Sequence, residues 1–172
     1  IGGGDWAKDR VVVDCMLAWN KGEHVEIRSP KATRPWQHVL EPLSGYLKLG
    51  LDLYNDDSLN GEGFNFGPRS EQNRTVQELL EDLSKYWVSE VKETFRITDN
   101  IPFHEAGLLK LNCDKALAYL KWQASLKYQD TIRFTSEWYF NFYKNKDINI
   151  LDFTIGQIQE YEEIFKENSK SL

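Results

Sequence analysis

The sequence predicts one helix-rich domain that mixes α-helices with short β-strands. Apolar residues recur at helical spacing in six segments, whereas strand-like alternation is confined to short, scattered runs. These runs do not alternate with helices as regularly as a doubly wound parallel sheet requires. The 172 residues are enough for one core, and contents of 41% hydrophobic and 28% charged residues are ordinary for a globular chain.

Local signals place the elements of the first half of the chain. Apolar groups fall on nearly every side of the first helix, which indicates a mostly buried one, and Lys21-Gly22 ends it. Pro42 suits the first turn of the next helix, whose apolar positions include Leu43, Leu47 and Tyr54. In chain order we expect a helix over 8–20, a strand over 24–28, a loop between Pro30 and Pro35, an extended run over 36–40, a helix from Glu41, a polar loop over 55–61 and a strand over 63–66.

Capping residues place the elements of the second half. Thr75 and Glu78 form a capping box in front of a helix whose apolar face ends at Trp87. In chain order we then expect a strand over 92–97, a helix from Asp114 through Leu120, a helix capped by Asp130 through Tyr143, a last helix capped by Thr154 that ends near Asn168, and a frayed tail over 166–172.

Charge and composition exclude several classes of partner. The net charge of −6 disfavours nucleic acid, because an acidic chain repels the phosphate backbone. We expect no membrane span, since no apolar run approaches about 18 residues, and no signal peptide is recognisable. Cys15 and Cys113 are interpreted as two buried thiols of a cytoplasmic protein. The chain begins at Ile1 without an initiator Met, which suggests a processed, truncated or partly represented polypeptide.

The standard nucleotide and metal motifs are incomplete. The run from Gly61 to Gly67 approaches a dinucleotide fingerprint, but its third glycine comes one place too late and no helix opens from it. A P-loop is absent from the sequence. His104-Glu105 lacks the second histidine of a zincin, since position 108 is Leu. We therefore expect no metal site.

Four residues have both a functional and a structural interpretation. Arg34 is either a surface arginine or a clamp for phosphate, whose geometry guanidinium matches. Trp36 is either a core residue or a ring-stacking platform. Arg10 lies in the first helical turn, where a cation opposes the helix dipole, and this favours a functional reason for it. Asn65 could fix a turn or reach a ligand. From the residues alone, the chain is a mixed α/β domain with a candidate anion pocket.

Several further segments, which cover nearly the whole chain, are informative when they are read in order. They are Gly2-Gly3-Gly4-Asp5-Trp6 with Asp9-Arg10, the run from Lys31 to Glu41 around Arg34, Phe64-Asn65-Phe66-Gly67, Pro102-Phe103-His104-Glu105, Leu120-Lys121-Trp122, and Thr131-Ile132-Arg133 through Glu137-Trp138-Tyr139. Together they resemble the extended short-chain dehydrogenases and, among them, the CDP-glucose 4,6-dehydratases.

The resemblance implies an enzyme that removes water from a nucleotide-linked glucose. In such a reaction NAD takes hydride from C4 of the sugar, water leaves across C5 and C6, and hydride returns at C6. The implied fold is a Rossmann domain with a smaller C-terminal lobe, and this chain, residues 1–172, corresponds to the lobe that holds the nucleotide sugar. The implied setting is deoxysugar supply for bacterial O-antigen and lipopolysaccharide, and the full-length enzyme is implied to be a homodimer.

The resemblance also implies the binding residues. Arg10, Arg34, Asn65 and His104 correspond to positions that hold the nucleotide and diphosphate, with Trp36 and Glu105 in a second rank. Related dTDP-glucose enzymes carry an arginine three residues before the turn histidine, where this chain has Ile101. One phosphate contact is therefore lost or supplied elsewhere.

No catalytic residue is expected within this chain. In the family, the glycine-rich NAD loop, the Tyr-x-x-x-Lys pair and the acid-base carboxylates precede the region that matches Ile1, so NAD would be bound by that N-terminal half. Two alternatives remain open. One is a UDP- or dTDP-sugar dehydratase or epimerase of the same superfamily. The other is a stand-alone interaction module, whose many aromatic residues dock a protein partner.

Overall fold

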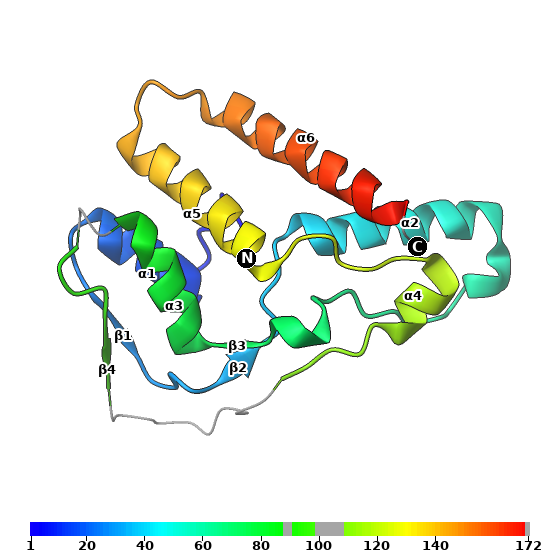
Figure 1. The fold of residues 1–172 in the computed structure, drawn as a ribbon, viewed down its shortest axis with the longest axis horizontal. Coiled ribbons are helices and arrows are strands. Elements are labelled where there is room, and N and C mark those ends of the chain that lie inside the picture. The colour runs from blue at the N-terminus through cyan, green and yellow to red at the C-terminus, as the bar shows by residue number, and fades with distance from the viewer. Residues whose placement is uncertain (88–90, 99–108, 171–172) are drawn as a thin grey trace.

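The computed structural model describes residues 1–87, 91–98 and 109–170, and these form a helix-rich α/β fold (Figure 1). The predicted fold class is confirmed. The helices within the described ranges are α1 (Val11–Asn20), α2 (Leu40–Asn55), α3 (Val76–Ser84), α4 (Asp114–Leu120), α5 (Tyr128–Lys144) and α6 (Ile150–Ser169). The strands there are β1 (Val25–Ile27), β2 (Thr33–Arg34), β3 (Arg74–Thr75) and β4 (Phe95–Ile97).

The strands form two small sheets that join distant parts of the chain. β1 pairs in parallel with β4, with Val25 opposite Phe95. β2 pairs antiparallel with β3, with Arg34 opposite Arg74. Sheets of two short strands have little stability of their own, so the packed helices hold the fold together.

Two predicted extended segments are not strands, and the predicted loop after Pro30 contains β2 instead. Residues 36–39 and 63–66 lie side by side without a ladder, and the Gln37 amide donates to the Phe66 carbonyl oxygen at 2.8 Å. Phe66 turns into the core, with its ring centroid 4.9 Å from that of Trp122. Packing of one aromatic side chain therefore prevails over local strand propensity.

The largest core cluster lies between α1, α3 and α5. Its centre contains two fully buried tryptophans, Trp19 and Trp87, whose ring centroids are 6.4 Å apart. A second cluster around Phe66, Leu120 and Trp122 joins α2 to α4. The Cys15 thiol is buried in the first cluster, as predicted, but Cys113 is only half-buried because it precedes α4 at the surface.

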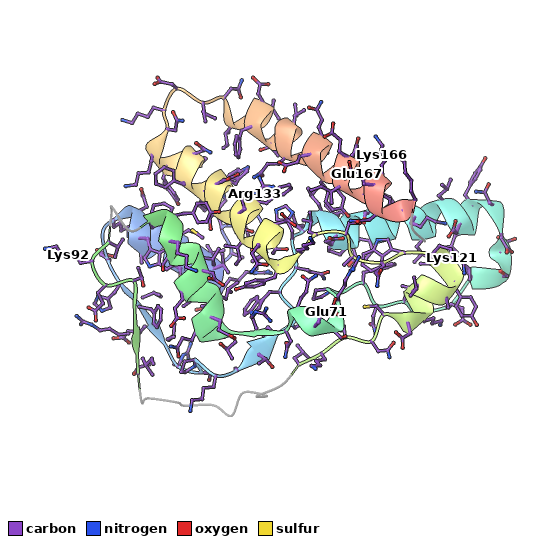
Figure 2. The ribbon with its side chains drawn as sticks, in the orientation of Figure 1. Glu71, Lys92, Lys121, Arg133, Lys166 and Glu167 are labelled. Atoms are coloured by element: carbon purple, nitrogen blue, oxygen red, sulfur yellow. The ribbon has the colours of Figure 1, made fainter. Side chains whose placement is uncertain are left out.

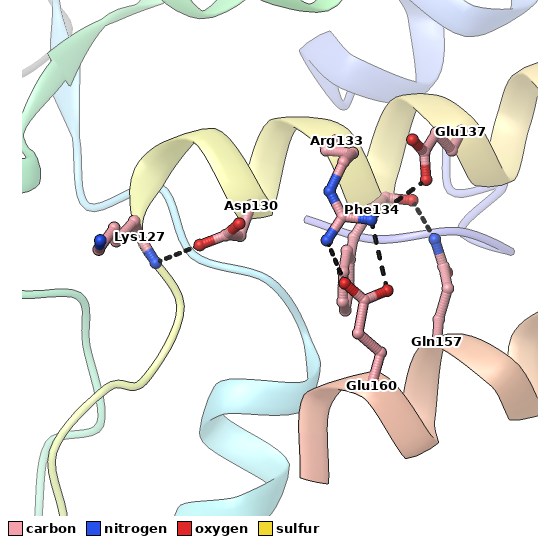
Figure 3. A network of polar contacts seen from close by, with 7 residues as sticks. All are labelled: Lys127, Asp130, Arg133, Phe134, Glu137, Gln157 and Glu160. Carbon is pink, nitrogen blue, oxygen red and sulfur yellow. Dashed lines mark hydrogen bonds and ion pairs between the residues drawn. The ribbon is translucent and has the colours of Figure 1, made fainter. Parts of the chain in front are cut away.

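α5 and α6 lie side by side and are joined by polar contacts (Figures 1 and 3). Arg133 bonds Glu160 at 2.5 Å, and the Gln157 amide donates to the Phe134 carbonyl oxygen at 2.9 Å. The same pairing explains one wrong helix start. Thr154 does not cap α6 but accepts a 2.8 Å hydrogen bond from the Trp138 indole of α5.

Asn149 caps α6 instead, accepting from the backbone N–H groups of Leu151 and Asp152. α5 likewise begins two residues before the predicted cap, at Tyr128, and Asp130 in its first turn accepts from the backbone N–H of Lys127 at 3.1 Å. At the other end, α6 is helical through Ser169, and Figure 2 shows Lys166 and Glu167 on its last turns. Fraying of the tail over 166–172 stays a prediction.

Candidate functional site

A cleft of about 610 Å³ lies where the first residues of the chain meet the start of α1 and the segment after β2. Three of the residues singled out from the sequence line it, namely Arg10, Arg34 and Trp36. Tyr139 of α5 also lines it. The other lining residues are Ile1, Gly2, Gly3, Gly4, Asp5, Val11, Val12, Val13, Pro35, Gln37 and Val39.

The glycine run forms one wall of this cleft and packs too closely for side chains. A Cβ atom on Gly3 would lie 2.1 Å from ring atoms of Trp138, and one on Gly2 would lie 2.8 Å from Val39 Cγ1. Gly4 has a φ of 78°, a left-handed conformation that favours glycine. The three glycines therefore fix the path of the wall.

Tyr139 ties this wall to α5. Its hydroxyl donates a 2.7 Å hydrogen bond to the carbonyl oxygen of Asp5, and burial raises its pKa to about 12. The Asp5 carboxylate accepts from the backbone N–H of Ala7 at 3.0 Å and lies 3.5 Å from the Arg10 guanidinium. These contacts connect α5 to the glycine wall through Asp5, and Asp5 in turn to Arg10.

Arg10 is the N-cap residue of α1. Asp9, with a φ of 62°, turns the chain into the helix, a conformation that aspartate tolerates better than most residues. No side chain of the described residues caps the first turn of α1, and Val11, Val12 and Val13 of that turn line the cleft. Unpaired backbone N–H groups at a helix start attract anions, and here two arginines line the same space.

Arg34, the second arginine of the lining, lies in β2. Its Nη1 atom donates to the carbonyl oxygen of Thr33 at 2.9 Å. Trp36 is mostly buried, packs in the largest core cluster, and donates from its indole nitrogen to the Arg74 carbonyl oxygen at 3.0 Å. The structure therefore gives Trp36 a core role in addition to its place in the cleft lining.

The remaining sequence candidates are not brought into this cleft. Asn65 is exposed, and its amide donates to the carbonyl oxygen of Asn112 at 3.1 Å. It fixes the approach of the chain to α4 and is not among the lining residues. His104 and Glu105 lie outside the described residues.

Sequence reasoning missed two polar residues beside the cleft, Gln37 and His38. The Gln37 Oε1 and His38 Nε2 atoms are buried without a hydrogen-bond partner among the described residues. Burial lowers the pKa of His38 to about 3, so the ring is neutral at neutral pH. The signal available was two consecutive polar residues inside the otherwise apolar run from Trp36 to Leu40.

The described ranges 1–87, 91–98 and 109–170 contain no group of three or more His, Cys, Asp and Glu side chains arranged to hold a metal ion. None of the helices described there combines the length and apolar character needed to cross a bilayer.

The chain is similar to CDP-glucose 4,6-dehydratase of Salmonella typhimurium, with 39% identity over 150 residues. The similarity covers 87% of this chain but 41% of that enzyme, in its C-terminal part, so the chain spans about two fifths of its relative. No family model matches the chain. The resemblance found in the sequence is confirmed by this relative.

Solved structures show the same fold at low sequence identity. UDP-glucuronic acid 4-epimerase from Bacillus cereus, in complex with UDP-glucuronic acid and NAD, superposes with a TM-score of 0.67 at 15% identity, over 83% of this chain and 43% of that one. dTDP-glucose 4,6-dehydratase from Bacillus anthracis, in complex with NAD, gives 0.64 at 16% identity, over 84% and 42%. This chain therefore has the fold of the C-terminal part of extended short-chain dehydrogenases that act on sugar nucleotides.

Proposed function

We propose that this chain is the nucleotide-sugar-binding portion of an NAD-dependent CDP-glucose 4,6-dehydratase. The observation that carries the proposal is the cleft, where Arg10, Arg34 and the open first turn of α1 line one space. The 39% identity to a CDP-glucose enzyme supports the same substrate. In the proposed complex, the two guanidinium groups and the α1 N–H groups bind the diphosphate, because all of them attract phosphate oxygens.

NAD does not fit the residues described here. A dinucleotide site needs a glycine turn that leads from a parallel strand into a helix. The Gly2-Gly3-Gly4 run packs instead against Trp138 and Val39, and the parallel strand β1 leads into the loop before β2. We therefore propose that the cofactor, and with it the hydride chemistry, belongs to the part of the enzyme that this chain does not span.

It follows that the purified chain alone should not dehydrate CDP-glucose, even with NAD present. Product formation by the chain alone, followed by the absorbance of the 4-keto sugar in alkali, would contradict this expectation. For the complete enzyme, we extend the proposal to a cytoplasmic homodimer that supplies deoxysugars for surface polysaccharide.

Thermal unfolding with added nucleotides tests the binding role. A ligand that binds only the folded chain stabilises it by about 2.7 kcal/mol at a hundredfold excess over Kd. We expect CDP-glucose and CDP to raise Tm, UDP and dTDP to raise it less, and NAD to leave it unchanged. A larger shift with UDP or dTDP would favour the other sugar-nucleotide enzymes of the superfamily.

Arginine variants locate the binding site. Arg34→Ala removes a cation from the cleft. A hydrogen bond to a charged group contributes about 1.5–3 kcal/mol, and water that replaces the side chain recovers part of this. CDP binding should therefore weaken about tenfold. Arg96→Ala is the matched control, because Arg96 is exposed on β4 and pairs with Glu93 away from the cleft. Equal CDP affinity in Arg34→Ala and the unchanged chain would refute the placement of the diphosphate.

One observation favours a second candidate, a protein-interaction role. Large apolar side chains are exposed along one face of α2, and exposed apolar patches mark interaction surfaces. Self-association that nucleotides leave unaltered, with no nucleotide-induced Tm shift, would favour this role over sugar-nucleotide binding.

A further inference from the structure

Asp5 lies among the cations of the cleft. Of the described residues that line this space, it alone has an acidic side chain, whereas Arg10 and Arg34 are basic. A carboxylate repels phosphate about as strongly as a guanidinium group at the same distance attracts it. Asp5 therefore lowers the affinity of the cleft for any anion, and it lowers this affinity most for the anions of highest charge.

The position of this carboxylate is fixed. Its Oδ1 atom accepts a hydrogen bond from the backbone N–H of Ala7 at 3.0 Å. The carbonyl oxygen of Asp5 accepts a second hydrogen bond, at 2.7 Å, from the hydroxyl of Tyr139, which is a buried residue. Because the side chain and the backbone of Asp5 are both held, its negative charge stays beside the cleft when an anion enters.

Arg10 lies next to Asp5 but keeps its hydrogen-bond donors. Its Nη1 atom is 3.5 Å from Asp5 Oδ2, whereas a strong charged hydrogen bond measures about 2.7–2.9 Å. The Arg10 side chain is 65% exposed and donates no hydrogen bond to the residues described in 1–87, 91–98 and 109–170. The ion pair therefore reduces the net charge near Arg10 without occupying its N–H groups, and a phosphate can still bind there.

The anions that share the cytidine group differ in charge. The terminal phosphate of a free nucleotide is a monoester, and it loses a second proton near a pH of about 6. A nucleotide sugar has no such group, because the sugar esterifies its last phosphate. At neutral pH, CDP therefore carries about one negative charge more than CDP-glucose, and CTP carries about two more.

We infer that Asp5 sets the charge selectivity of the cleft and favours the sugar-linked diphosphate over free CDP and CTP. The inference rests on the proposed function, in which the diphosphate lies beside Arg10 and Arg34. The two arginines attract all three ligands, and Asp5 removes part of the advantage that the extra charges of CDP and CTP give. Asp5 needs no contact with the ligand, because repulsion between charges acts across several ångströms. It is a specificity-determining residue and not a catalytic one.

Asp5→Asn tests the inference by calorimetric titration with CDP-glucose, CDP and CTP at low ionic strength. Asparagine keeps an oxygen that accepts from the Ala7 N–H, so the variant removes the charge and preserves the local turn. Relative to CDP-glucose, the affinity for CDP should rise about threefold and that for CTP about tenfold. Added salt should reduce both changes. A variant that alters the three affinities by one common factor would overturn the inference, since a merely structural role of Asp5 gives that result.

Two control variants separate the position of the charge from its presence. Asp5→Glu keeps a carboxylate at the cleft, so the affinity ratios should stay within about twofold of the unchanged chain. Glu62→Gln removes one negative charge that pairs with Lys115 outside the lining, and it should leave the ratios unaltered. Equal shifts of the ratios in Glu62→Gln and Asp5→Asn would assign the selectivity to the net charge of the chain. The Ile1 amino group is the same in every variant and cancels in these comparisons.

A second neutral variant keeps the test decisive if Asp5→Asn does not fold. Asp5→Ser also removes the charge, and its hydroxyl oxygen can accept from the Ala7 N–H. The same rise of CDP and CTP affinity relative to CDP-glucose is expected, and unchanged ratios would count against the inference in the same way.

The titrations also distinguish this inference from the proposed function. A chain without affinity for any of the three cytidine ligands would refute the proposed function and, with it, the inference. A chain that binds CDP-glucose but keeps its affinity ratios in Asp5→Asn would refute the charge selectivity alone.

Discussion

The inner and outer faces of α2 differ in what covers them. On the inner face, Glu41 is 1% exposed and its carboxylate accepts hydrogen bonds from the backbone N–H groups of Ser125 and Leu126 and from the Tyr161 hydroxyl. On the outer face, Leu43, Leu47 and Tyr54 are apolar and exposed. The comparison teaches that amphipathic spacing identifies a face of a helix but not which neighbour that face meets.

The largest effect should come from removing the inner carboxylate. Glu41→Ala leaves the buried N–H groups of Ser125 and Leu126 without their acceptor, and each such loss costs about 1–3 kcal/mol. We expect the free energy of unfolding in urea to fall by about 3 kcal/mol. Glu163→Ala, an exposed change on α6, should alter it by less than about 0.5 kcal/mol. A loss at Glu41 no larger than at Glu163 would show that the network is dispensable.

Two glycines of α2 compare the faces with the same substitution. A Cβ atom on Gly45 would lie 2.3 Å from the Phe66 ring, whereas one on Gly50 would meet no described atom within 4 Å. Gly45→Ala should therefore destabilise the fold by about 1–3 kcal/mol through overpacking. Gly50→Ala should stabilise it by about 0.5–1 kcal/mol, since alanine favours a helix. Both are read from urea unfolding, and changes of the same sign would contradict the packing described for the inner face.

The pH dependence of stability should show a smaller effect of the same carboxylate. Burial raises the pKa of Glu41 above its ordinary value, against the opposing effect of its hydrogen bonds. A raised pKa in the folded state means that the folded chain binds the proton more tightly. Its contribution to stability is therefore full below the unfolded pKa and declines as pH rises through the folded pKa. Glu41→Gln should flatten this decline in urea unfolding from pH 4 upward. An unchanged slope would show that Glu41 does not titrate differently in the folded chain.

The sequence predicted the elements whose signals are local and failed where packing decides. The Thr75–Glu78 capping box is present as predicted, because both partners lie within one turn. The cap of α6 was placed five residues late, at Thr154 instead of Asn149, because Thr154 is engaged by Trp138 of another helix. Phe66 leaves a predicted strand for the same kind of reason, since its partner Trp122 is far along the chain.

The candidate site divides in the same way. Arg10 and Arg34 were singled out from their charge and position, and the fold brings both to one cleft. Asn65 was singled out from its turn, but its amide is used by Asn112. Tyr139 could not be singled out at all, because its hydroxyl contacts Asp5, a residue 134 positions away in the sequence, only in the folded chain.

The last prediction compares two tyrosine hydroxyls, one that supports the cleft wall and one that joins the inner face of α2. Tyr139→Phe keeps the ring in the core and removes only the hydroxyl that donates to the Asp5 carbonyl oxygen. Since Asp5 holds Arg10, the loss should loosen the cleft wall and weaken CDP-glucose binding by about 1 kcal/mol, or roughly fivefold in Kd. Tyr161→Phe is the matched control, because its hydroxyl contacts Glu41 and Ser44 and not the wall. It should lower stability without changing Kd in calorimetric titration. If the two variants instead lose stability alike and bind CDP-glucose alike, the Tyr139 hydroxyl supports the fold in general and does not position Arg10.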